Sequence, residues 1–235
     1  MRKNHKPSRP ENDGHRGYSA LELLVVMMVS LIIAALTIPN FNQIRRNLRI
    51  SGDARDLNGA INQAKLQAAA DFTWARVYGD FTNPRLSTFH VEVWNKALNG
   101  GAGCWQTVGD PIAAAPFVRC TVAGTSPVQT MSDQVTFGFG GAGAPPPNTQ
   151  TKGIAQASPC QNIAGGNGTT ANTGCIVFNS RGMPINWGNG TPTPDDAFYI
   201  TDNTVVYGMT VGPTGISQIW AAQANGGTGG SWYHK

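Results

Sequence analysis

A basic amino-terminal segment followed directly by a long apolar run constrains this chain more than any other feature. Residues 1–17 hold Arg2, Lys3, Lys6, Arg9 and Arg16 against Glu11 and Asp13. Residues Leu23 to Ile38 carry no charge. With Tyr18 to Leu21 included, the apolar segment is about long enough to cross the ~30 Å hydrocarbon layer of a bilayer. We therefore expect a membrane-spanning helix whose positive flank stays in the cytoplasm.

Gly17 lies on the unusual side of this apolar run. An ordinary secretory signal places its small-residue cleavage site after the apolar region, whereas here the small residue comes before it. Cleavage after Gly17 would leave the hydrophobic helix on the mature chain. Glu22 interrupts the run, and a carboxylate inside a membrane span normally has a partner. The natural partner is the new α-amino group of Tyr18 on a neighbouring subunit. The alternative is a plain membrane anchor with a tolerated acidic residue.

The combination of a short basic leader, Gly17, Tyr18 and Glu22 resembles the type IV prepilin superfamily. The family usually has Phe where this chain has Tyr18. The resemblance implies cleavage by prepilin peptidase between Gly17 and Tyr18, methylation of the Tyr18 amino group, and a role for Glu22 in assembly. Pro39 matches a proline common in pilin helices, and its missing N–H predicts a kink or local melting of the helix there.

Beyond Asn40 the sequence predicts the amphipathic second half of the same helix. Apolar residues recur at three- and four-residue steps, at Phe41, Ile44, Leu48, Ala54, Leu57, Ile61, Ala64, Ala68 and Phe72. A helix from Tyr18 to about Val77 would be on the order of 90 Å long, too long for a small domain to bury completely. The stripe lacks the sustained heptads of a free coiled coil. We expect its second half to pack on a sheet.

Residues 79–235 are expected to form a β-rich domain. Period-two alternation or apolar runs predict strands at Phe89–Trp94, Phe117–Val122, Val135–Phe139, Cys175–Asn179, Ala197–Thr201, Thr204–Val211 and Ile216–Ala221. Gly212 to Gly215 predicts a hairpin turn. The Gly- and Pro-rich stretch at about 140–174 predicts a long surface loop. The expected organisation is α+β: a leader at 1–17, a membrane or filament-core helix at 18–39, its amphipathic continuation at 40–78, and the domain at 79–235.

Four cysteines follow the membrane segment, on the expected non-cytoplasmic side. An even number in an oxidising compartment favours disulfides, and sequence order favours Cys104 with Cys120 and Cys160 with Cys175. Crossed pairings remain open. A zinc site is the rival interpretation, but no two of these residues have the short spacing of zinc ligands. We expect no metal or cofactor.

Composition argues against catalysis and against a nucleic-acid partner. Removing the leader's five basic and two acidic residues from totals of 17 and 13 leaves 12 and 11, so the mature chain is nearly neutral. His5 and His15 belong to the leader, which leaves His90 on a predicted strand, where we expect it to face solvent, and His234 at the tail. No catalytic group is expected, and the chain is not predicted to be an enzyme.

The later sequence resembles one branch of the superfamily. Phe178 to Gly182 and the final hairpin at Thr214-Gly215 are similar to the minor-pilin and H-type pseudopilin branch, the GspH/FimT family. The resemblance implies a structural subunit of a type IV pilus or type II secretion pseudopilus, held in the bacterial inner membrane with a periplasmic domain and then assembled into a filament. Its partners would be other pilin or pseudopilin subunits, prepilin peptidase, the inner-membrane assembly platform and, before assembly, membrane lipid.

Two other functions stay open. The first is a major pilin, which would begin in the same way. The second is a minor pilin that captures DNA, which would need Lys or Arg on a carboxy-terminal loop to neutralise phosphates. No Lys or Arg occurs from Gly182 to Ala224, although Trp187, Trp220 and Trp232 could stack on bases.

Overall fold

The computed structural model describes residues 18–110, 120, 127–151, 153–194, 196–224 and 231–235, and the side chains of residues 38–40 lie outside this description. The chain divides into two compact units, residues 1–44 and residues 45–235. The expected leader and its cleavage residue Gly17 lie outside the described residues.

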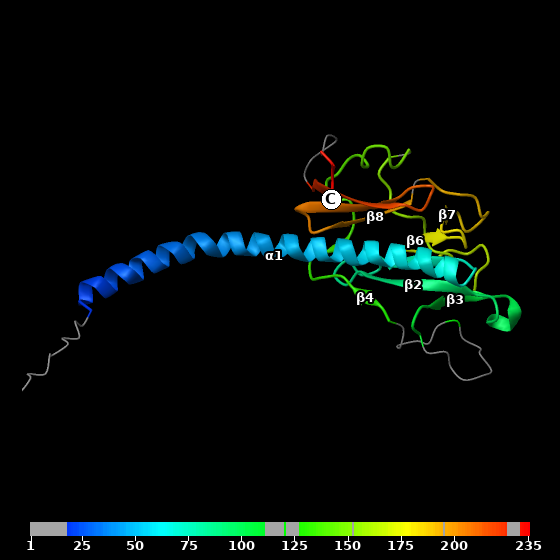
Figure 1. The fold of residues 1–235 in the computed structure, drawn as a ribbon, viewed down its shortest axis with the longest axis horizontal. Helices are drawn as coiled ribbons and strands as arrows, with labels where there is room; N and C mark the ends of the chain where they lie inside the picture. The colour runs from blue at the N-terminus through cyan, green and yellow to red at the C-terminus, as the bar shows by residue number, and fades with distance from the viewer. Residues whose placement is uncertain (1–17, 111–119, 121–126, 152, 195, 225–230) are drawn as a thin grey trace, which may run out of the picture. The chain divides into compact units, whose positions relative to one another are not determined.

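One long helix, α1 (Ala20–Ala70), contributes to both units (Figure 1). Its helical backbone continues through Pro39, so the helix is not melted there, and a kink at Pro39 stays a prediction. The helix ends at Ala70 and not near Val77. The expected continuation was therefore too long, because residues 75–80 form a strand.

The end of α1 is a turn that the sequence pattern does not signal. The amide of Thr73 donates to the carbonyl of Ala68 at 3.2 Å, and Phe72 has a positive φ of 47°. This is the geometry of a Schellman ending, in which the residue after the helix adopts the left-handed conformation and is usually Gly. Because Phe occupies that position, the apolar periodicity runs past the true end of the helix.

The second unit contains two antiparallel sheets. The first sheet has the order β3-β2-β1-β6-β7, with β4 also pairing with β2. Its strands are β1 (Ala75–Asp80), β2 (Thr88–Asn95), β3 (Cys104–Thr107), β4 (Gln129–Thr130), β6 (Thr173–Phe178) and β7 (Pro184–Ile185), and a short 3-10 helix, η1 (Asn99–Gly101), lies between β2 and β3.

The second sheet has the order β11-β10-β9-β8-β5. Its strands are β5 (Thr136–Phe137), β8 (Asp196–Thr201), β9 (Val205–Val211), β10 (Ser217–Gln223) and β11 (Tyr233–His234). The expected hairpin joins β9 to β10, where the Gly212 amide donates to the carbonyl of Ile216 at 2.9 Å and Gly215 has a positive φ of 75°.

The core lies where the second half of α1 meets both sheets. One buried cluster unites Ile50, Leu57 and Ile61 of α1 with residues of β1, β2, β6, β8, β9 and β10. In Figure 1 this part of α1 runs alongside strands of both sheets. The expected packing of the amphipathic helix on a sheet is confirmed from Ile50 onward, so the chain has an α+β architecture.

The outcome for the other expected elements is mixed. Strands lie within or close to the expected ranges at β2, β6, β8, β9 and β10, whereas β5 is shorter than expected. The strand expected at Phe117–Val122 falls almost wholly outside the described residues. Strands β1 and β3 were not expected from the sequence.

The Gly- and Pro-rich stretch between β5 and β6 lies largely at the surface, as expected, and most of its described residues are exposed. Some of its groups also bond to strands. Ala157 donates its amide to the carbonyl of Ala197 in β8, and the amide of Trp105 in β3 donates to the carbonyl of Ile163. Cys160 is fully buried. The stretch is therefore a surface loop that also covers strands, which its composition alone does not show.

Candidate assembly helix and disulfide-anchored cluster

The first part of α1 exposes nearly all of its apolar surface. Its exposed large side chains include Leu21, Leu23, Leu24, Val25, Val26, Met27, Met28, Val29, Leu31, Ile32, Ile33 and Leu36. Among the described residues, α1 is the one helix long and apolar enough to span a membrane. Soluble monomeric domains rarely expose contiguous apolar patches of this size, which mark membrane or protein contacts.

The two hydroxyl groups inside this segment are bonded within the helix. Ser30 donates its Oγ hydrogen to the carbonyl of Val26 at 2.8 Å, and Thr37 donates to the carbonyl of Ile33. Because a hydrocarbon layer offers no water, polar groups there must be satisfied internally. The segment is thus chemically suited to an apolar environment at these positions as well.

Glu22 lies in the first turn of α1. Ser19 caps the helix by accepting the amide hydrogen of Leu21 on its Oγ at 3.2 Å. Ser19 and Glu22 have the spacing of a capping box, and a carboxylate near the helix amino terminus is favoured by the helix dipole. Tyr18 lies beside this turn with its side chain 83% exposed. Glu22 is exposed in this turn.

The four cysteines form two disulfides in the second unit. Cys104 of β3 is bonded to Cys120, and Cys160 is bonded to Cys175 of β6, with Cα atoms 5.6 and 4.9 Å apart. This is the local pairing that sequence order favours. Among the described residues no group of three or more His, Cys, Asp or Glu side chains could hold a metal ion.

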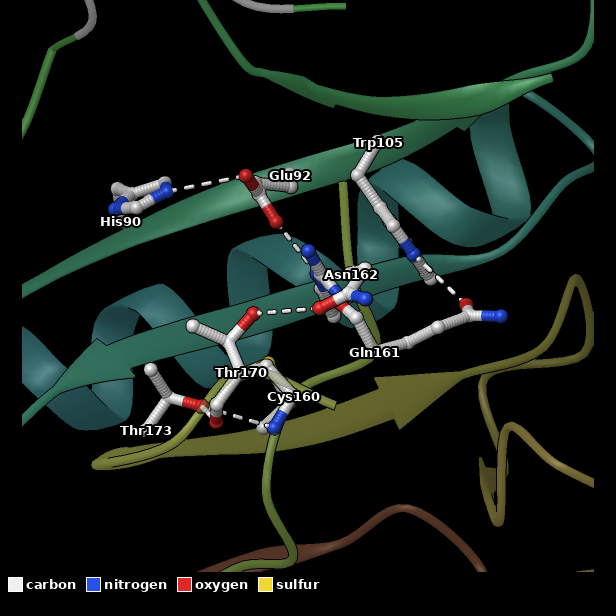
Figure 2. The surroundings of a disulfide bond; sticks show 10 residues. His90, Glu92, Trp105, Cys160, Gln161, Asn162, Thr170 and Thr173 are labelled. Atoms are coloured by element: carbon white, nitrogen blue, oxygen red, sulfur yellow. Dashed lines mark hydrogen bonds and ion pairs between the residues drawn. A yellow bond between two sulfur atoms is a disulfide. The ribbon is translucent and has the colours of Figure 1, made fainter. Parts of the chain in front are cut away.

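A buried polar cluster lies beside the second disulfide, on the face of the first sheet that points away from α1 (Figure 2). The strand register places Arg76 of β1 directly opposite Glu92 of β2. Arg76 Nε donates to Glu92 Oε2 at 2.5 Å, and both side chains are almost fully buried. Such cross-strand neighbours are the pairs that stabilise a sheet.

The loop that carries the second disulfide completes this cluster. Arg76 Nη1 donates to the carbonyl of Gln161 at 2.7 Å, and the guanidinium lies 4.1 Å from the ring centroid of Trp105. Trp105 Nε1 in turn donates to Gln161 Oε1 at 3.0 Å. The guanidinium thus contacts side chains of the first sheet and the residue next to Cys160, so the cluster holds the loop on the sheet.

His90 belongs to the edge of this cluster and does not face solvent as expected. Its register partner is Tyr78, whose ring stacks on it with centroids 4.9 Å apart. His90 Nε2 lies 3.2 Å from Glu92 Oε1, and its side chain is only 15% exposed. The period-two pattern placed His90 on the correct face, but it could not reveal that a later loop covers that face.

The electrostatics of Glu92 have two opposing causes. Burial raises the pKa of its carboxyl group, whereas the charge of Arg76 and the hydrogen bond from His90 lower it. The net effect is a pKa below the ordinary value of 4.5, so Glu92 is ionised at neutral pH. The pair is therefore a buried salt bridge between β1 and β2.

No family model, curated protein or solved structure matches this chain. Tyr18 precedes α1 and Glu22 lies in its first turn, whereas the cysteines lie in the second unit. Neither Arg76 nor Gln161 was expected from the sequence to join a site, since one lay in the expected helix and the other in the expected surface loop.

Proposed function

We propose that this chain is a structural subunit of a type IV pilus or a type II secretion pseudopilus, most similar to the minor-pilin and H-type pseudopilin branch. One observation carries the proposal. A single helix exposes an apolar segment at its start and, from Ile50 onward, buries one face in the chain's own domain. This division gives one polypeptide a membrane or filament-core part and a folded domain, joined without a linker.

The assembly mechanism follows from the environment of the apolar segment. Lipid tails and neighbouring apolar helices are similar surroundings, so moving from one to the other supplies little hydrophobic driving force. The preference of the subunit for the filament over the membrane must therefore come from polar contacts. Cleavage between Gly17 and Tyr18 by a prepilin peptidase creates a positive amino group, which pairs with Glu22 of an adjacent subunit as the assembly platform extracts the chain from the inner membrane.

The remaining features suit the periplasmic side of that membrane. Two local disulfides and the buried Arg76–Glu92 pair hold the domain together in an oxidising compartment. A major pilin would share all of these features, so the position of the subunit in the filament is a further question for assembly experiments.

DNA capture receives less support than a structural role. Trp220 donates its indole hydrogen to Thr210 Oγ1 at 3.1 Å, and Trp232 donates to the carbonyl of Ala144 at 2.8 Å and packs on Tyr199. These rings already have packing roles within the chain, and the segment around them supplies no Lys or Arg from Gly182 to Ala224. Phosphate neutralisation would have to come from elsewhere.

Photo-crosslinking in the chain's own cells tests the proposal. A photoreactive residue replaces Leu31, whose side chain is 70% exposed in the apolar segment. We expect adducts with other subunits, and we expect Glu22→Ala to reduce them while leaving the chain in the membrane, since removing a charge makes insertion easier. Asp56→Ala, which removes an exposed carboxylate later in α1, is the matched control and should leave the adducts unchanged.

Glu22→Gln separates the two roles of this side chain. A glutamine still completes a capping box but cannot pair ionically with an amino group. Loss of subunit adducts in Glu22→Gln supports intermolecular pairing. Wild-type adducts with lipid alone would make the chain a simple membrane anchor. Full subunit adducts in Glu22→Ala would show that the subunits associate without the Glu22 charge.

A further inference from the structure

The turn after α1 exposes an aromatic ring on a strained backbone conformation. Neither the exposure nor the conformation stabilises the fold. Phe72 occupies the left-handed position of the Schellman ending, with a φ of 47°. Bulky residues rarely adopt this conformation, whereas Gly or Asn adopt it readily. The ring is nevertheless 83% exposed, so packing within the chain does not compensate. An exposed apolar ring on an unfavourable backbone indicates a role outside the domain.

Phe72 stands between two hollows in the surface of the second unit. The larger has a volume of about 550 Å³ and lies between the last turn of α1 and the ends of β2 and β3. The smaller, of about 250 Å³, shares Phe72, Trp94 and Lys96 with it and adds Trp74. The larger volume is within the range of small-molecule sites. Phe72, Trp74 and Trp94 thus line one continuous stretch of hollowed surface.

The position of Trp94 is fixed by its neighbours. Its ring meets Trp105 edge to face with centroids 5.4 Å apart. A Cβ added at Gly103 or Gly165 would lie 2.7 or 2.5 Å from the same ring, so both glycines are needed for this close approach. The wall of the hollow is therefore rigid on the Trp94 side.

The polar groups of the larger hollow are oriented by bonds to one another. Asn95 Nδ2 donates to Gln106 Oε1 at 3.0 Å, and Gln67 Nε2 donates to Asp71 Oδ2 at 2.7 Å. These bonds leave the amide nitrogen of Gln106 to donate, and Gln67 Oε1 and Asp71 Oδ1 to accept. Planar donors and acceptors held in place beside aromatic rings can recognise hydroxyl groups.

The charge around the hollow gives no advantage to anionic ligands. Lys96 and Asp71 in its lining carry opposite charges. A phosphate or carboxylate ligand would therefore meet no net positive charge there. The favoured ligand is uncharged, has an apolar face for the aromatic rings, and has several hydroxyl groups for the amides and carboxylate.

From this combination we propose that the hollow at the end of α1 binds a neutral oligosaccharide. A pyranose ring has an apolar C–H face, which stacks on the negative face of the Phe72 ring, and a rim of hydroxyl groups, which bond to Gln106, Gln67 and Asp71. The binding site lies wholly in the second unit. It goes beyond the proposed filament role, because it lets the subunit bind a ligand at its exposed surface.

Binding to three defined sugars tests this inference. The mature full chain is placed in lipid nanodiscs, because common detergents carry sugar headgroups, and is titrated by calorimetry with cellohexaose, chitohexaose and maltohexaose. We expect saturable binding of at least one sugar, reduced tenfold or more by Phe72→Ala and retained by Phe72→Trp. Leu66→Ala, which removes another exposed side chain of α1 that does not line the hollow, should bind as wild type.

The substitution Phe72→Asn gives a readout that a structural role would not produce. Asn adopts a positive φ easily, so the melting temperature should rise while sugar binding is lost. Absence of binding by all three sugars, or binding that Phe72→Ala leaves unchanged, would overturn the inference. Crosslinking of a photoreactive residue at Phe72 to a second copy of the chain, without sugar binding, would assign the ring to a subunit interface instead.

Discussion

Replacing Glu92 with Gln should destabilise the second unit strongly, because it leaves the Arg76 guanidinium buried without a counter-charge. Arg76 is 1% exposed and Glu92 is 2% exposed. Removing one partner of a buried pair costs about 3–5 kcal/mol. Arg76 keeps its bond to the Gln161 carbonyl and its contact with Trp105. These contacts place the expected loss in the free energy of unfolding at the lower end, about 3 kcal/mol.

A double variant tests the reasoning behind that number. In Arg76→Met/Glu92→Leu no charge is left buried, and apolar side chains fill the space. Replacing a buried pair in this way is often neutral or stabilising, but here the Gln161 carbonyl loses its donor, at about 1–2 kcal/mol. The double variant should therefore be more stable than Glu92→Gln alone.

The pH dependence of the stability difference between wild type and Glu92→Gln is an independent test of the Arg76–Glu92 pair. Because the folded-state pKa of Glu92 is lowered, its contribution to stability is present above the ordinary pKa of 4.5 and is lost as the pH falls through the folded value. The stability difference between wild type and Glu92→Gln should therefore be constant near neutral pH and should shrink below about pH 4.5.

Urea unfolding of residues 43–235, followed by tryptophan fluorescence, measures these differences. We expect this fragment to fold without the apolar segment, since the main core cluster extends only from Ile50 to Ala221. A loss below about 1 kcal/mol in Glu92→Gln would refute the argument, because an exposed pair would give that result. A double variant less stable than the single variant would refute it as well.

Two further predictions concern the same fragment. Non-reducing peptide mapping should find Cys104 joined to Cys120 and Cys160 joined to Cys175, and removing the second bond by Cys160→Ser/Cys175→Ser should cost about 3 kcal/mol in the chain-entropy view. Free thiols or bound zinc in periplasmically expressed protein would contradict this pairing. Gly215→Ala should lower stability by more than about 1 kcal/mol, since its Cβ would lie 2.0 Å from the Gly182 carbonyl oxygen. Gly153→Ala, also at a positive φ but with nothing within 4 Å of its Cβ, is the control, and equal losses in the two variants would exclude the contact as the cause.

The sequence predicted the elements whose periodicity is local. The alternation of Phe89, Val91 and Val93 marked β2, and Gly212 to Gly215 marked the turn between β9 and β10. The end of α1 was not predictable in this way, because Phe72 continues the apolar spacing and the turn lacks the usual Gly. A period of hydrophobicity reports which face is buried, and it does not report where a backbone hydrogen-bond pattern changes.

The polar cluster required tertiary information. Arg76 and Glu92 become neighbours only through the register of β1 and β2, and β1 itself was hidden in the expected helix. Gln161 joins them from a stretch whose Gly and Pro content indicates a loop but does not show what it covers. The Cys pairing was within reach of the sequence, since the closest cysteines along the chain are also the ones that meet.

The central claim is that the chain is processed like a prepilin and keeps its apolar helix for assembly. The most direct test is the intact mass of the protein purified from its native membrane, with amino-terminal sequencing of the same sample. The account predicts a chain that begins at Tyr18, with or without a methyl group on its amino nitrogen, and a Gly17→Ala variant that keeps residues 1–17. A mature chain that begins at Met1, or at any residue beyond Ile38, would contradict it.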